Sequence, residues 1–143
     1  MLREMVSKYY NGTYDLNCAE TILYAANEEY ELGLSHETLK AMAGFGGGMA
    51  VEGVCGAAAG AVAVIGIMFT NQRAHESDRI KKLVGEFMKA FNEKLGTYNC
   101  KQLKERYRTE DERCSKMILT AADVLEEICT ANPSYNKAGL VLL

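Results

Sequence analysis

The sequence predicts an all-α fold in a single domain, and three observations lead to this prediction. Apolar residues recur at helical spacing along nearly the whole chain. No stretch shows the sustained alternation of apolar and polar residues that is typical of strands. Cap residues precede several of the apolar stripes. We therefore expect residues 1–143 to form one compact helical bundle of about five to six helices with a glycine-rich loop.

The N-terminal part of the chain contains three expected helices. An apolar stripe predicts a short amphipathic helix over residues 2–9. Asn17 is expected to cap the next helix, with Glu20 as its capping-box partner. Ser35 is expected to cap a short helix over residues 36–43.

The middle of the chain is rich in small residues. Segment 44–49, which contains four glycines, is expected to be its most flexible part. A helix of mostly small residues is expected over residues 54–69, and the following helix is expected to end at Leu95. Gly96 is a plausible left-handed residue just past that end.

The C-terminal part repeats the capping pattern. Asn99 precedes a further helix, with Gln102 at the position of the capping partner. Residues 109–112 read as a capping box that opens a helix to about Cys129. The apolar end, residues 139–143, could be a docked segment or a late strand, and the sequence does not decide between them.

Composition limits the classes of partner. The formal net charge is −3 and the basic residues are dispersed, so a nucleic-acid partner is not expected. The uncharged run 54–69 is shorter than the roughly 18–20 residues of a membrane span, so no stable membrane insertion is expected. The five cysteines occur without an export signal, which favours a cytoplasmic location and metal or redox chemistry.

Three cysteines are expected in the first turns of helices. Cys18 follows Asn17, Cys100 follows Asn99, and Cys55 lies near the start of the small-residue helix. Free N–H groups and the helix dipole favour anions there, which would lower the pKa of a thiol. The alternative is that a cysteine serves only as a small buried hydrophobe. We favour that alternative for Cys129, and helical periodicity alone would favour it for Cys114.

The segment Cys55-Gly-Ala-Ala-Ala-Gly60 fits the pattern Cys-Gly-Ala-x-x-Gly. It lies between an upstream cysteine in Asn17-Cys18-Ala19-Glu20 and two downstream cysteines, Cys100 and Cys114. In the order and number of these cysteines the chain resembles the C_GCAxxG_C_C family of redox-active proteins. The resemblance implies a redox role and, from cytochromes that carry a similar module, an iron–sulfur cluster.

These observations give one leading hypothesis and two alternatives. We expect Cys18, Cys55, Cys100 and Cys114 to hold an iron–sulfur cluster that transfers electrons to a redox partner protein. The backbone of Gly56, Ala57 and Gly60 is expected to approach the cofactor. Alternatively, two of the cysteines form the redox thiols of a thiol–disulfide oxidoreductase, or all four hold structural zinc. The sequence leaves homodimer formation open.

Other candidate residues have simpler explanations. His36 and His75 lie among polar residues and are expected at the surface. The segment 44–48 lacks both the P-loop and the dinucleotide-binding spacing, so nucleotide binding there is rejected.

Overall fold

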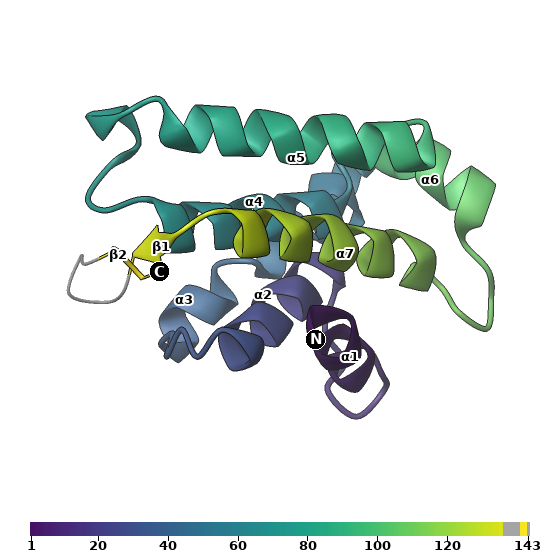
Figure 1. The fold of residues 1–143 in the computed structure, drawn as a ribbon. Coiled ribbons are helices and arrows are strands. Elements are labelled where there is room, and N and C mark those ends of the chain that lie inside the picture. Colours follow the sequence, from purple (N-terminus) through teal and green to yellow (C-terminus); the bar gives the residue numbers. More distant parts are fainter. Residues whose placement is uncertain (136–140, 143) are drawn as a thin grey trace.

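Seven α-helices account for most of the described chain, residues 1–135 and 141–142 of a computed structural model (Figure 1). The predicted all-α fold is confirmed, and the seven helices, one more than the expected five to six, correspond to the segments that the sequence marked individually as helical. The helices are α1 Leu2–Tyr9, α2 Cys18–Glu29, α3 His36–Lys40, α4 Gly56–Phe69, α5 Arg79–Leu95, α6 Cys100–Tyr107 and α7 Ser115–Ala131. The shorter elements are η1 Ala43–Phe45, η2 Gly48–Glu52, η3 Ala74–Glu76, β1 Ser134–Tyr135 and β2 Val141–Leu142.

Helix α4 is the centre of the bundle and packs against α2, α5 and α7 (Figure 1). Most of its residues are buried, which confirms the expectation that the uncharged run forms a core helix. Gly60 allows the closest approach, since a Cβ there would lie 2.7 Å from the carbonyl oxygen of Ala19 in α2. Among the described residues, no helix is long and apolar enough to cross a membrane.

Helix α1 packs against both α2 and α7. Leu2 and Val6 are fully buried. The backbone N–H of Leu2 donates to Glu126 Oε1 at 2.9 Å, and Arg3 forms an ion pair with Asp123 at 2.9 Å. The residues that follow α1 are therefore held close to the start of α2 and α7.

The predicted caps of α2 and α6 are confirmed. Asn17 Oδ1 accepts from the Glu20 N–H at 2.9 Å, and Glu20 Oε1 accepts from the Asn17 N–H at 3.0 Å. Asn99 Oδ1 accepts from the Gln102 N–H at 3.1 Å. Gly96 ends α5 with a φ of +83°, as expected for a left-handed terminal residue.

The predicted start of the last helix is wrong. Residues 109–112 form a turn instead, closed by a β-bridge between Thr109 and Arg113. Arg113 has a φ of +51°, which a right-handed helix does not allow, and α7 therefore begins at Ser115. This shift makes Cys114 the N-cap of α7 rather than a member of its apolar stripe.

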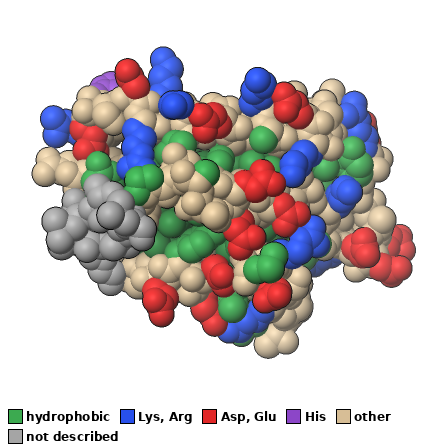
Figure 2. Space-filling model, in the orientation of Figure 1, with side chains coloured by type: hydrophobic (Ala, Val, Ile, Leu, Met, Phe, Trp, Pro, Cys, Tyr) green, Lys and Arg blue, Asp and Glu red, His purple; other side chains and the backbone are tan. Residues whose placement is uncertain are grey.

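The C-terminal tail contains a pair of very short strands. Ser134 and Tyr135 pair antiparallel with Leu142 and Val141. The strand alternative for the tail is thus found at Val141–Leu142, and residues 139, 140 and 143 lie outside the described residues. On the face shown in Figure 2, acidic and basic side chains are interspersed, in line with the small net charge.

Candidate functional site: four cysteines at four helix starts

The structure brings the four predicted cysteines to one place. Cys18 and Cys100 are the first residues of α2 and α6, and Cys55 and Cys114 are the N-caps of α4 and α7. All four line a cavity of about 30 Å³. The other residues around it are Gly47, Gly56, Leu103, Lys104 and Met117.

The helix starts make this site favourable for negative charge. Four helices of 8 to 17 residues begin there, and α6 and the start of α7 lie at the same end of the molecule (Figure 1). Each start carries the positive end of a helix dipole, and cap side chains or neighbouring carbonyls already accept from some of its first N–H groups. The arrangement therefore suits thiolates or a bound anionic group.

Backbone hydrogen bonds join the segments that carry Cys55 and Cys100. The Cys55 N–H donates to the Tyr98 carbonyl at 2.8 Å, and the Cys100 N–H donates to the Gly53 carbonyl at 2.6 Å. Val54 and Asn99 form the β-bridge between these bonds. The two cysteines are thus fixed relative to each other by main-chain contacts.

The two capping asparagines also hold the glycine-rich loop, residues 43–53. Asn17 Nδ2 donates to the Ala43 carbonyl at 2.9 Å, at the start of the loop. Asn99 Nδ2 donates to the Glu52 carbonyl at 3.3 Å, near its end. Each asparagine therefore caps a cysteine-bearing helix and anchors the loop beside it.

The loop passes close to the cysteines in a rare conformation. Gly47, Gly48, Met49 and Ala50 are consecutive left-handed residues, with φ between 60° and 62°. This conformation costs roughly 1–2 kcal/mol for each residue with a side chain. A Cβ at Gly48 would lie 2.7 Å from Cys100 Cβ, so only glycine fits there.

Cys18 and Cys114 form an interacting pair of sulfurs. A hydrogen bond from the Cys18 thiol is the main cause that lowers the pKa of Cys114 to about 6. The positive charges of Arg108, Lys104 and Arg113 lower it further, against the effect of burial. The same hydrogen bond, together with burial, raises the pKa of Cys18 far above its usual range.

The pKa values of the other two thiols, Cys55 and Cys100, are raised, whereas the sequence predicted that they would be lowered. Cys55 and Cys100 are only 5% and 6% exposed. Burial raises the pKa of Cys55 to about 11, although the N–H groups of Ala58 and Ala57 oppose this. Burial also raises the pKa of Cys100, opposed by Lys104. A helix start thus does not lower the pKa of Cys18, Cys55 or Cys100, because hydrogen bonding or desolvation outweighs it.

Tyr10, just after α1, completes the surroundings of Cys114. Its Oη accepts a hydrogen bond from the Cys114 N–H at 3.1 Å. The Arg113 guanidinium lies 5.1 Å from the centroid of the Tyr10 ring. This contact satisfies an N–H at the start of α7, and no sequence signal marked Tyr10.

The donor set fits a thiolate-bound centre, and the sulfurs must turn to form one. Four cysteine thiolates are the usual ligand set of iron–sulfur clusters and of many structural zinc sites. Among the described residues, no group of three or more His, Cys, Asp or Glu side chains is already arranged to hold a metal ion. The cavity of about 30 Å³ has room for roughly one or two water-sized groups. A cluster would therefore require the cavity to widen, and the glycine-rich loop, of which Gly47 lines the cavity, is the neighbouring segment with the fewest side chains to displace.

Of the three residues whose backbone was expected to approach the cofactor, two lie at the cavity and one does not. Gly56 lines the cavity, and a Cβ there would lie 3.3 Å from Cys18 Cβ. Ala57 contributes its N–H near Cys55. Gly60 lies one turn further along α4 and faces Ala19, where its role is close packing.

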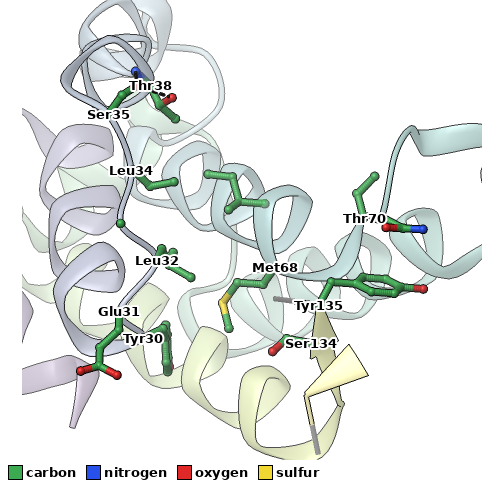
Figure 3. Close-up of a pocket in the computed structure, with 13 residues that line it drawn as sticks. Tyr30, Glu31, Leu32, Leu34, Ser35, Thr38, Met68, Thr70, Ser134 and Tyr135 are labelled. Atoms are coloured by element: carbon green, nitrogen blue, oxygen red, sulfur yellow. Dashed lines mark hydrogen bonds between the residues drawn. The ribbon is translucent and has the colours of Figure 1, made fainter. Parts of the chain in front are cut away.

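The remaining candidates lie away from this cavity. Cys129 is in the last part of α7, where its Sγ contacts Met68 Sδ at 3.7 Å, as expected for a packing residue. His36 and His75 are exposed, as predicted. A larger pocket, of about 750 Å³, lies at the opposite end of α4 around Met68 and contains no cysteine among its described lining residues (Figure 3).

Cys114 should be the most acidic thiol of the reduced, metal-free protein. We expect its alkylation by iodoacetamide to rise with pH around a midpoint near 6, the value to which its pKa is lowered. An ordinary cysteine would titrate near about 8.5. Peptide mass spectrometry would follow Cys114, and Cys18→Ala should move the midpoint upward because the hydrogen-bond donor is lost. A midpoint at or above the ordinary value in the unmutated protein would contradict this assignment.

Fold and site together define a class: an all-helical protein in which four cysteines, each at the start of a different helix, surround one buried cavity. A family model described as "Putative redox-active protein (C_GCAxxG_C_C)" matches residues 16–128, which include all four cysteines. The chain therefore belongs to the C_GCAxxG_C_C family. No curated protein and no solved structure matches it.

Proposed function

We propose that this protein transfers electrons through an iron–sulfur cluster held by Cys18, Cys55, Cys100 and Cys114. The observation that carries the proposal is the convergence of four thiols on one cavity from four helix starts. The redox description of the family adds support, because zinc has no redox chemistry of its own. When bound, such a cluster would accept and release single electrons.

The residues around the cavity would each have a defined task. The four cysteines would supply the thiolate ligands. The N–H groups of Ala57 and Ala58 would stabilise negative charge on the Cys55 sulfur, as they already do in opposing its raised pKa. The buried side chains of Leu103 and Met117 would exclude water from one side.

Anaerobic purification with a visible spectrum and analysis of iron, zinc and acid-labile sulfide tests the proposal. We expect iron and sulfide together with charge-transfer absorbance. Cys55→Ala should abolish all three because it removes a ligand. Cys129→Ala is the matched control and should retain them, since Cys129 lies near the far end of α7. A colourless protein without iron would contradict the proposal, and zinc alone would indicate a structural centre.

The contact between Cys18 and Cys114 favours a second candidate function, thiol–disulfide exchange. The Cys114 thiolate would attack a partner disulfide, forming a mixed disulfide and releasing one partner thiolate. The Cys18 sulfur would then attack the Cys114 sulfur, and its proton would pass to a partner thiolate. The products would be a Cys18–Cys114 disulfide and a partner reduced by two electrons. This candidate requires a colourless protein in which these two thiols pair reversibly on oxidation.

A further inference from the structure

We infer that the surface formed by Met49, Val51 and Tyr98 is the docking face for an acidic redox protein. The inference rests on the proposed redox function and names the surface through which it would operate. We call these three side chains the Met49 patch and include in it Lys101, three residues after Tyr98, and Lys104, which pairs with Glu52 next to Val51.

The apolar part of the patch is unusually exposed. Met49, Val51 and Tyr98 are 49%, 79% and 46% exposed. They make up three of the five large hydrophobic residues that are exposed among the described residues, the others being Met1 and Tyr14. They also belong to two segments joined by the bridge between Val54 and Asn99. Exposed large apolar side chains on two joined segments suit an interaction surface.

The patch is directly connected to two of the cysteines. The Tyr98 carbonyl accepts from the Cys55 N–H at 2.8 Å, and the carbonyl of Gly53, two residues after Val51, accepts from the Cys100 N–H at 2.6 Å. A partner on this surface would thus be one hydrogen bond from the backbone of a cysteine residue. The sulfurs of Cys55 and Cys100 are themselves buried, so a partner must approach through such a covering surface.

The charge beside the patch determines the kind of partner. Lys101 is exposed, and Lys104 both lines the cysteine cavity and pairs with Glu52 at 3.5 Å. With Glu52 counted, the two lysines leave the patch a balance of one positive charge, in a chain whose formal net charge is −3. The acidic residues 110–112 follow the far end of α6, roughly 12 Å along its axis. Positive charge beside an exposed apolar centre is complementary to a partner with an acidic rim.

The test is a binding titration with two probe proteins, an acidic plant-type ferredoxin and the basic cytochrome c. We expect ferredoxin to bind more tightly, by about tenfold or more at about 0.01 M salt, and to weaken at about 0.15 M. Calorimetry measures this binding whatever the cysteines hold, so it is independent of the cluster analysis. A protein that contains the cluster but lacks this selectivity would retain the proposed function and overturn the docking face.

Two matched pairs of variants locate the surface. Tyr98→Ser should weaken ferredoxin binding about threefold or more, whereas Tyr14→Ser, at a similarly exposed tyrosine on the loop before α2, should not. Lys101→Glu should weaken it to a similar degree, whereas Lys82→Glu should not, because Lys82 is an exposed residue at the start of α5 and the opposite end of that helix leads to α6 (Figure 1). Equal effects within either pair, no binding of ferredoxin, or tighter binding of cytochrome c would overturn the inference. Thermal unfolding of each variant checks that the fold is retained.

Discussion

Gly60→Ala should lower the free energy of unfolding by about 2 kcal/mol, because it forces α4 away from α2. The added Cβ would lie 2.7 Å from the carbonyl oxygen of Ala19 and 3.1 Å from Ile22 Cβ. The first of these is a backbone atom, so relief requires a shift of the helix itself. The higher helix propensity of alanine returns at most about 1 kcal/mol. Denaturant unfolding followed by circular dichroism measures the change.

Gly66→Ala provides the control within the same helix. A Cβ at Gly66 has no atom within 4 Å, so the substitution adds helix propensity without a clash. We expect it to raise the free energy of unfolding by about 0.5–1 kcal/mol. The two alanines should thus have effects of opposite sign. Stabilisation by both would show that α2 and α4 do not pack as closely as described.

Gly48→Ala should disturb the cysteine site itself. Its Cβ would lie 2.5 Å from the Gly53 nitrogen and 2.7 Å from Cys100 Cβ, at a backbone with a φ of +62°. Either Cys100 or the glycine-rich loop must move. We expect the alkylation rate of the buried Cys100 to rise by about tenfold, which corresponds to a local loss of about 1.4 kcal/mol.

Gly47→Ala separates the clash from the backbone strain. Gly47 has the same φ of +62°, and a Cβ there meets no atom within 4 Å. Both substitutions place an alanine in a left-handed conformation, which destabilises the fold by roughly 1–2 kcal/mol, but only the Cβ of Gly48→Ala collides with Cys100. Alkylation of Cys100 at the wild-type rate in Gly48→Ala would contradict the described position of the loop.

Much of the fold follows from local signals in the sequence. Asn17 and Asn99 mark helix starts, and both side chains cap their helices. Glu20 completes the capping box of α2, whereas the side chain of Gln102 accepts from Thr97 Oγ1 at 2.6 Å and does not return the bond to Asn99. The start of α7 was missed because Thr109–Glu112 has the residues of a capping box and does form its Thr109–Glu112 hydrogen bond. The left-handed backbone of Arg113, which ends that turn, has no signature in the residue type.

The candidate site was predictable in its residues and not in its electrostatics. The neighbouring residues of Cys18, Cys55 and Cys100 predicted that these three lie at helix starts. Cys114 also lies at a helix start, but only because α7 begins later than predicted. The pKa of Cys114 depends most on Cys18, which is distant in the sequence, and less on positive charges of residues 104–113 that the turn and α6 bring near its sulfur. Tyr10 lies outside the family match at residues 16–128, so only tertiary structure connects it with Cys114.

The side chains of Asn17 and Asn99 make contacts that most other cap residues would not reproduce. Aspartate, serine and asparagine are nearly equivalent as acceptors at a helix start. At Asn17 and Asn99, however, the amide nitrogen donates to the carbonyls of Ala43 and Glu52. Aspartate would preserve each helix start, release the adjoining end of the loop and add a negative charge next to a cysteine. These two positions thus use a donor and an acceptor at the same time, and asparagine supplies them as separate atoms, Nδ2 and Oδ1, of one planar amide.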